Sequence, residues 1–297
     1  MRIGVVLPHT GPTASPTFIR DFAQTAEGCG LDRLWAVDHL VLPHHVSSPY
    51  LLGRRPTAVA DGWLSENLAP NFEMLTTLSF VAGQTDTIGL GTSVAVLPIR
   101  NPIANARQLA TLDALSGGRL VYGVGIGWMR EEALAMDMPW DNRAARAEEH
   151  IDVLRTLWCA NEPYVEFSGS YYAFDSMDPS PQPQQRPIPI LVGGHSTAAM
   201  KRAVRIGDGW ISAPTSQSRF AELLAELLRL AEAQGRPRTD LQVVASVRLD
   251  PQAGVDELGK TFDAYRRMGV DHLQVVPPAE DPARTIDDLA LLAAGTG

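Results

Sequence analysis

The sequence predicts an α/β protein of the (β/α)8 barrel class, and three observations lead to this prediction. The chain has 297 residues, of which 45% are hydrophobic and 20% charged, as is typical of a compact globular protein. Short segments rich in Val, Ile and Leu alternate with segments of helical periodicity. Eight such pairs follow one another along the chain, which is the repeat number of a barrel of about 250 residues.

The expected strands carry little polar alternation, as strands covered by helices on both faces should. They are Ile3–Leu7, Arg33–Val37, Ile88–Val94, Leu120–Gly125, Ile188–Val192, Gly209–Ser212, Gln242–Val247 and His272–Val276. The expected helices are Thr17–Cys29, Phe72–Gln84, Ile103–Leu115, Arg143–Trp158, Thr197–Ile206, Ser218–Gln234, Asp256–Met268 and Pro282–Leu292. We expect residues 1–297 to form a single domain.

A doubly wound open sheet is the alternative architecture. It would require a glycine-rich dinucleotide turn after the first strand. The turn there reads Leu7-Pro8-His9-Thr10-Gly11-Pro12, which lacks that pattern. The barrel is therefore favoured.

Two insertions interrupt the alternation. Val41–Asn71 follows the second strand, and loops in that position lie at the carboxyl-end face, where barrel active sites are found. We expect this loop to form a wall or lid of the site. Asn161–Pro187 follows a helix and contains a predicted hairpin, with strands at Tyr164–Phe167 and Tyr171–Phe174. We expect the hairpin to lie away from the chemistry.

Charge and composition exclude several classes of partner. The chain has 25 Lys and Arg against 34 Asp and Glu, a formal charge of −9, which disfavours nucleic acid and anionic membranes. No run of 18 apolar residues predicts a membrane span, and no secretory signal precedes Pro8. The 2 cysteines form no metal or disulfide pattern. We expect a cytoplasmic protein that takes a small-molecule substrate.

Ionisable and glycine-rich residues follow several expected strands. Asp38 and His39 end the second strand, where a carboxylate and an imidazole could take part in proton transfer. Alternatively, Asp38 could cap the loop and His39 could pack beneath it. After the fourth strand, glycine alternates with larger residues through Gly125-Ile126-Gly127-Trp128. Bare backbone there could lie against a flat ligand, or the glycines could simply permit tight packing at the barrel mouth.

The fifth strand leads into Gly193-Gly194-His195-Ser196 and then directly into a helix. Exposed backbone N–H groups at a positive helix terminus form a favourable site for an anion or phosphate. We expect Arg100 or Arg202 to add positive charge near this anion site.

No metal site is expected. The adjacent His44 and His45 point in divergent directions in an extended chain, and the sequence contains no HExxH motif. Glu131 and Glu132 are interpreted as acids in the first turn of a helix, where they complement its dipole.

Together these segments resemble the bacterial-luciferase-like superfamily, and in particular its deazaflavin-dependent branch. The resemblance covers essentially the whole chain. It rests on Asp38-His39, Gly91-Thr92-Ser93-Val94, Arg100-Asn101-Pro102, Thr111-Leu112-Asp113 with Ser116-Gly117-Gly118-Arg119-Leu120, Gly123 to Trp128, Met129-Arg130-Glu131-Glu132, Gly193-Gly194-His195-Ser196 and Gly207-Asp208-Gly209-Trp210. It implies a barrel that binds coenzyme F420, or alternatively FMN, at the carboxyl-end face, and a homodimer.

The resemblance also implies residue roles. Asp38 and His39 would flank the redox-active edge of the ring, with His39 moving a proton or stabilising charge. Ser93–Val94 would be a non-prolyl cis peptide that presses the back of the ring. Gly125, Ile126, Gly127 and Trp128 would line the ring pocket. Gly193, Gly194, His195 and Ser212 would hold the ribityl phosphate.

The implied activity is hydride transfer between the deazaflavin and a small organic substrate. One departure bears on that substrate, because the sugar-phosphate dehydrogenases of this branch carry an acidic Glu where Trp128 stands here. Trp128 would instead form an apolar wall. An FMN-dependent monooxygenase that uses reduced flavin and O₂ is the first alternative function, and a non-catalytic flavin-binding protein is the second.

Overall fold

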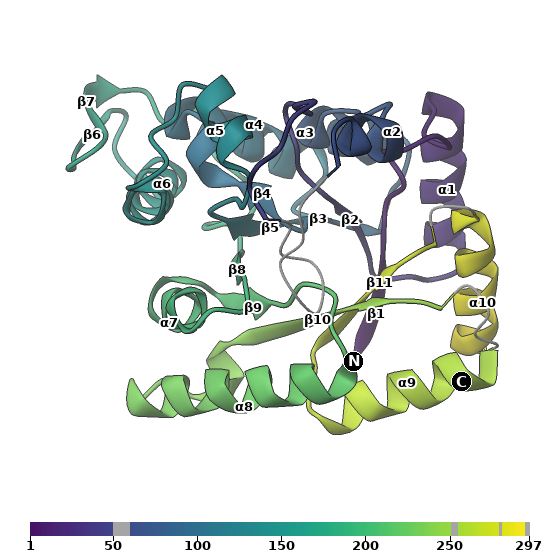
Figure 1. Cartoon of the computed structure of the whole chain (residues 1–297). Helices are drawn as coiled ribbons and strands as arrows, with labels where there is room; N and C mark the ends of the chain where they lie inside the picture. The colour runs from purple at the N-terminus through teal and green to yellow at the C-terminus, as the bar shows by residue number, and fades with distance from the viewer. Residues whose placement is uncertain (50–59, 251–254, 279–280, 295–297) are drawn as a thin grey trace.

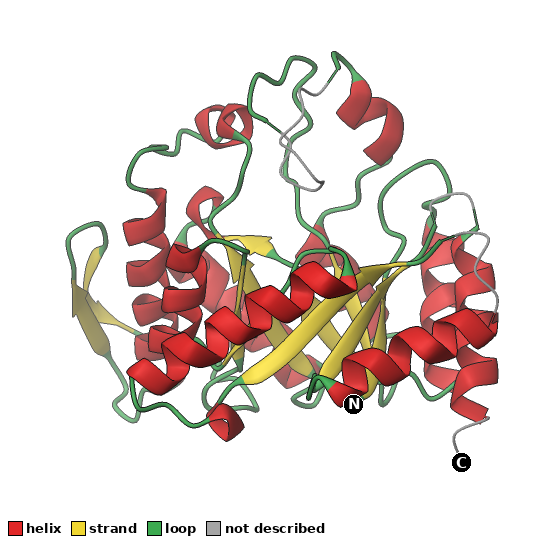
Figure 2. Cartoon of the chain, turned by 60° about the horizontal axis from the view of Figure 1, so that its bottom comes forward, coloured by secondary structure: helices red, strands yellow, loops and turns green. Residues whose placement is uncertain are grey.

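The computed structural model describes residues 1–49, 60–250, 255–278 and 281–294 and shows a closed barrel of parallel strands ringed by helices (Figures 1 and 2). The barrel strands are β1 (Arg2–Val6), β2 (Arg33–Ala36), β3 (Gly89–Thr92), β4 (Ala95–Val96), β5 (Leu120–Gly125), β8 (Ile190–Gly193), β9 (Gly209–Ile211), β10 (Gln242–Arg248) and β11 (His272–Val276). Their order is β3-β2-β1-β11-β10-β9-β8-β5-β4, and pairing of β3 with β5 closes the ring. The predicted barrel is confirmed, and the open sheet is excluded.

The helices expected after the strands are present. They are α1 (Pro16–Gly28), α3 (Met74–Ala82), α4 (Pro102–Leu115), α6 (Arg143–Trp158), α7 (Thr197–Ile206), α8 (Gln217–Ala233), α9 (Val255–Arg267) and α10 (Pro282–Ala294). Short polar side chains cap the first turns of α1 and α4: Ser15 accepts from Phe18 N at 3.2 Å, and Asn101 accepts from Ile103 N at 3.0 Å. Pro16 and Pro102 occupy the position after the cap, where proline loses no hydrogen bond.

Two short helices were not among the eight expected ones. α2 (Trp63–Leu68) lies inside the long insertion after β2, and α5 (Arg130–Ala135) follows β5. Glu131 and Glu132 stand in the first turn of α5, as the sequence suggested. Long loops and both short helices gather at one end of the barrel (Figure 2). Residues 50–59 of the predicted lid lie outside the described residues.

The predicted hairpin is present as β6 (Val165–Ser168) and β7 (Ala173–Met177), which pair antiparallel in a separate sheet. It projects outward beside α6, away from the barrel (Figure 1). Glu149 of α6 holds its turn, because the carboxylate accepts from the N–H groups of Ser170, Tyr171 and Tyr172 at 2.7–2.9 Å. The expectation that this insertion lies away from the barrel mouth is confirmed.

A small apolar cluster fills the inside of the barrel, and Trp35 is its largest member. The indole is only 1% exposed. A Cβ on Gly4 would lie 2.8 Å from Trp35 Nε1, and one on Gly91 would lie 2.5 Å from Trp35 Cε3. Glycine at these two positions therefore makes room for the indole across neighbouring strands.

The third barrel strand departs most from its predicted form. We expected one strand over Ile88–Val94, but the pairing breaks at Ser93 and Val94 and separates β3 from β4. The Ser93–Val94 peptide bond is cis, as the resemblance implied. This bulge carries Val94 into contact with the interior cluster.

Among the described residues, no helix is long and apolar enough to cross a membrane.

Candidate active site

The residues singled out from the sequence collect at the carboxyl ends of the barrel strands. Asp38 and His39 follow β2, Ser93 and Val94 separate β3 from β4, and Gly125 to Trp128 end β5 and continue beyond it. Gly193 to Ser196 end β8, and Ser212 follows β9. Because all these strands are parallel, their carboxyl ends share one rim of the barrel.

Asp38 is buried in an ion pair with Arg100. Its two oxygens accept from the guanidinium of Arg100 at 2.5 and 2.7 Å, and one also accepts from Val96 N at 2.7 Å. Burial alone would lower the pKa of Arg100, but attraction to Asp38 raises it above its ordinary value. Asp38 thus fixes the end of β2 to the segment after the bulge, and its carboxylate is already bonded without a ligand.

His39 is held by a carboxylate distant in sequence. Its Nδ1 lies 3.0 Å from Oε2 of Glu132, and its ring meets Trp128 edge to face with centroids 6.1 Å apart. The side chain of His39 is 17% exposed, whereas that of Glu132 is 3% exposed. The imidazole is therefore pinned through Nδ1, while Nε2 has no hydrogen-bond partner among the described residues.

Glu131, next to Glu132 on α5, fastens another part of the same loop. One of its oxygens accepts from Ser47 N at 2.7 Å, Ser47 Oγ at 2.9 Å and Ser48 N at 3.1 Å. Burial alone would raise the pKa of Glu131, but these hydrogen bonds lower it to about 2. The two adjacent acids of α5 therefore tie down both the start of the β2 loop and the stretch near residue 48.

Glycines of β5 and β8 make space for the bulge between β3 and β4. A Cβ on Gly125 would lie 2.7 Å from Val94 Cγ2, and one on Gly193 would lie 2.8 Å from Val94 Cγ1. A Cβ on Gly123 would lie 2.0 Å from the carbonyl oxygen of Thr92. Of the two explanations left open by the sequence, tight packing at the barrel mouth therefore accounts for these glycines without a ligand.

The anion site predicted after β8 has the expected form. Ser196 caps α7 by accepting from Ala199 N at 3.1 Å, and Gly194 adopts a φ of +123° that favours glycine. His195 Nε2 accepts the N–H of Ala213 at 3.0 Å, so its Nδ1 carries the hydrogen of the neutral ring. The turn thus presents the start of a helix together with an imidazole N–H.

All three arginines considered for this turn are ion-paired. Arg100 pairs with Asp38, and Arg202 pairs with Glu148 at 3.0 Å. Burial lowers the pKa of His195 below its ordinary value, and Arg219 on α8 lowers it further. Arg219 itself pairs with Glu222 at 2.6 Å, so the expectation that an arginine adds positive charge at this turn stays a prediction.

Ser212 is buried, and its hydroxyl already accepts the N–H of Ser246 at 3.0 Å. Trp210, two residues earlier in the chain, donates through Nε1 to the carbonyl oxygen of Gly194 at 2.8 Å. Both contacts join β9 to its neighbours. The bond from Trp210 fixes the carbonyl group of Gly194 in the turn that carries His195.

His44 and His45 do not diverge as we expected. Their rings meet edge to face with centroids 4.5 Å apart, and His45 Nδ1 lies 2.9 Å from Asp61. Ligand atoms of the three residues lie within 4.8 Å of one another. All three are exposed on the outer surface of the β2 loop, and the expectation that the protein binds no metal stays a prediction.

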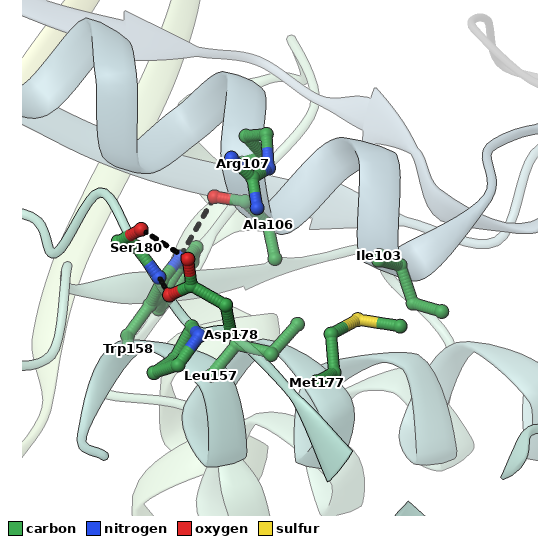
Figure 3. A pocket seen from close by; sticks show the side chains of 9 residues that line it. Ile103, Ala106, Arg107, Leu157, Trp158, Met177, Asp178 and Ser180 are labelled. Atoms are coloured by element: carbon green, nitrogen blue, oxygen red, sulfur yellow. Dashed lines mark hydrogen bonds between the residues drawn. The ribbon is translucent and has the colours of Figure 1, made fainter. Parts of the chain in front are cut away.

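A pocket outside the barrel is a separate feature. It lies between α4, α6 and the segment after β7, with Arg107, Trp158 and Asp178 among its lining residues (Figure 3). Asp178 accepts from Ser180 N at 2.8 Å and Ser180 Oγ at 2.9 Å, so local turn geometry explains its position. None of the predicted site residues lines this pocket.

A sequence model of the luciferase-like monooxygenase family matches residues 1–285. The chain belongs to this family. Among its relatives, an F420-dependent glucose-6-phosphate dehydrogenase of Kineococcus radiotolerans is 32% identical over 286 residues, 93% of this chain and 77% of that protein. An uncharacterized protein of Mycobacterium tuberculosis is 33% identical over 223 residues, 74% of this chain and 73% of that protein.

Solved structures of other enzymes share the fold. The monooxygenase RslO1 from Streptomyces bottropensis is 21% identical with a TM-score of 0.76, and 98% of each chain is covered. An F420-dependent secondary alcohol dehydrogenase in complex with an F420-acetone adduct is 17% identical with a TM-score of 0.76, over 98% of this chain and 97% of that one. At these identities the likeness extends to the barrel architecture.

Sequence reasoning did not identify Glu132 as a partner of His39 in this candidate site. It was interpreted as an acid complementing the helix dipole, but it contacts His39 across 93 positions of sequence. The signal available in the sequence was the position of Glu132, which follows shortly after the glycine-rich end of a barrel strand. A titratable acid near that rim is a candidate partner for a histidine on a neighbouring strand.

Proposed function

We propose that this protein is an F420-dependent oxidoreductase that transfers a hydride between the deazaflavin ring and a small organic substrate. One observation carries the proposal: an imidazole held by a carboxylate and a Ser-capped helix start after paired glycines occupy the same rim of the barrel. The F420-dependent relative at 32% identity supports the choice of cofactor.

The residues present fit an anionic deazaflavin. Gly193, Gly194 and His195 would bind its phosphate through the start of α7 and the Nδ1–H of His195, and Arg219 would add positive charge. Coenzyme F420 supplies the hydride acceptor or donor when it is bound. This local attraction would act against the global charge of −9.

The chain's own residues would handle the proton. With Nδ1 bonded to Glu132, Nε2 of His39 can accept the proton of a substrate hydroxyl or return it to a carbonyl oxygen. Asp38 would act through position, because Arg100 and Val96 occupy its oxygens. Ser93, Val94, Gly125, Ile126 and Gly127 would form the wall behind the ring.

Trp128 bears on the class of substrate. It lies edge to face with His39, at the position where the sugar-phosphate dehydrogenases of this branch carry an acidic residue. An indole offers apolar surface and a single N–H donor, so it favours a less polar substrate than a sugar phosphate. We propose a small alcohol or carbonyl compound.

Titration of the purified protein with oxidised F420 and with FMN, followed by fluorescence, tests the cofactor. We expect tighter binding of F420. A clear preference for FMN would replace the proposal with the FMN-dependent monooxygenase that uses reduced flavin and O₂, an alternative favoured by the likeness to RslO1. A panel of small alcohols with F420, and of their carbonyl products with reduced F420, then identifies the substrate.

A non-catalytic flavin-binding protein is the remaining alternative. It predicts tight binding of cofactor with no turnover on any member of the panel.

We further propose that the protein is a homodimer, as the resemblance implies, and that it lies in the cytoplasm. Light scattering should then give twice the chain mass of 32.2 kDa, and a single chain mass would reject the dimer.

A further inference from the structure

Glu132 divides its two carboxylate oxygens between two tasks. Oε1 accepts from the backbone N–H of Leu40 at 2.7 Å and of Val41 at 3.3 Å. Oε2 lies 3.0 Å from Nδ1 of His39. The residue is 2% exposed, so water contributes little to either oxygen. One side of the carboxylate therefore fastens the loop, and the other contacts only the imidazole.

This division determines which nitrogen of His39 carries the hydrogen. A carboxylate oxygen accepts, so the bond to Oε2 requires a hydrogen on Nδ1. The neutral ring then has a bare Nε2, with no hydrogen-bond partner among the described residues. We propose that Glu132 is a positioning residue that holds His39 in its Nδ1–H tautomer, so that Nε2 is a proton acceptor.

The tautomer follows from the geometry alone, whereas its effect on turnover rests on the proposed function. When Nε2 takes a proton from the substrate hydroxyl, His39 becomes a cation, and the adjacent carboxylate stabilises that cation. No bond to Glu132 has to form or break in this step. The proton later leaves from the same nitrogen, so Glu132 ends as it began.

The variant Glu132→Gln tests the control of the His39 tautomer separately from the hydrogen bonds that hold the loop. Its Oε1 can still accept from Leu40 N and Val41 N, which orients the amide and places its NH₂ group where Oε2 now faces His39. An NH₂ group donates, so Nδ1 of His39 must become the acceptor and the hydrogen must move to Nε2. The loop would stay fastened while the tautomer inverts.

Glu131→Gln is the matched control. It removes the same charge from the adjacent residue of α5, and its remaining oxygen can still accept from Ser47 and Ser48. No hydrogen bond of Glu131 reaches His39 among the described residues. This variant therefore reports the effect of charge loss alone, without a change of hydrogen-bond polarity at the histidine.

The test is ¹⁵N NMR of histidine-labelled full-length protein without cofactor at pH 8.5, about two units above the ordinary imidazole pKa. His39→Asn assigns the His39 signals among the 7 histidines. We expect the Nδ1–H pattern in wild type and in Glu131→Gln, and the Nε2–H pattern in Glu132→Gln. The wild-type measurement stands even if the Gln variant does not fold.

An Nε2–H or doubly protonated His39 in wild type would overturn the proposal, as would an unchanged tautomer in folded Glu132→Gln. With a substrate from the panel, Glu132→Gln should lower kcat at least about tenfold while its Kd for F420 stays within twofold, since a wrong tautomer impairs proton transfer. Equal kcat for Glu132→Gln and wild type would show that the tautomer of His39 does not affect turnover. Because the NMR test uses no cofactor, failure to bind F420 would count against the proposed function alone.

Discussion

Two histidines on the rim of the barrel show opposite hydrogen-bond polarity. His39, after β2, contacts Glu132 through Nδ1 and leaves Nε2 as an acceptor. His195, after β8, accepts the N–H of Ala213 at Nε2 and leaves Nδ1–H as a donor. The neighbours of each ring thus leave an acceptor nitrogen at one position and a donor N–H at the other, which suits the proposed proton transfer and the proposed anion binding, respectively.

The difference lies in the charge of the partner. A carboxylate beside His39 stabilises the protonated ring, which suits a group that gains a proton during a reaction. A backbone amide beside His195 offers a neutral donor, and burial together with Arg219 lowers the pKa of that ring. His195 therefore remains uncharged at neutral pH, and its contribution to anion binding is one directional hydrogen bond.

Removal of His39 should have the largest effect. His39→Ala should lower kcat by about 10²–10⁴-fold, the contribution of a positioned acid or base, with little change in the Kd for F420. Turnover of F420 with a substrate from the panel, together with a fluorescence titration, measures both quantities. Unchanged turnover would show that His39 has no catalytic role.

The bulge between the two histidines can be tested by overpacking. Gly125→Ala would place a methyl group 2.7 Å from Val94 Cγ2, so the free energy of unfolding should fall by about 1–3 kcal/mol. Urea denaturation measures this change. The double variant Gly125→Ala, Val94→Ala should recover most of the loss, because the shorter side chain leaves room. Equal instability of the single and double variants would mean that Val94 is not the obstacle.

His195→Ala should weaken cofactor binding rather than chemistry. Loss of one hydrogen bond to a charged group, worth about 1.5–3 kcal/mol, corresponds to a rise of about ten- to a hundredfold in the Kd for F420. A deazaflavin without the phosphate should bind both proteins equally well. If the variant weakens binding of the phosphate-free compound to the same extent, His195 contacts the ring rather than the phosphate.

The smallest expected effect concerns pH. Because the pKa of His195 lies below its ordinary value of about 6.5, the ring is mostly neutral when the pH falls from 8 to about 7.5. The ratio of the F420 Kd values of His195→Asn and wild type should therefore change less than about twofold over this range. A ratio that climbs as the pH falls would reveal a protonated His195 that attracts the phosphate through charge.

Local pattern predicted most of the fold. α6, α7, β5 and β11 have the bounds expected from the sequence, because apolar periodicity and cap residues act over a few positions. The cis peptide at the break in the third strand was implied by the resemblance alone. α2 and α5 escaped prediction because each has 6 residues, too few for helical periodicity to stand out from a loop.

For the site, as for the fold, local patterns predicted positions but not contacts between distant segments. The rim positions of His39 and His195 came from the rule that functional side chains follow parallel strands at their carboxyl ends. Their partners did not follow from any local rule. The sequence left open whether Asp38 is reactive or caps the loop, and the structure gives both of its oxygens hydrogen bonds from Arg100, 62 positions away.

By itself, the sequence determined the barrel, the rim on which the site lies and the residue types available there, because each depends on patterns a few residues long. Only the tertiary structure decided what those residues can do. Glu132 meets His39 because α5 follows β5 while His39 follows β2, and closure of the barrel places their loops together. Hydrogen-bond polarity depends on such contacts between distant segments, and no local pattern encodes them.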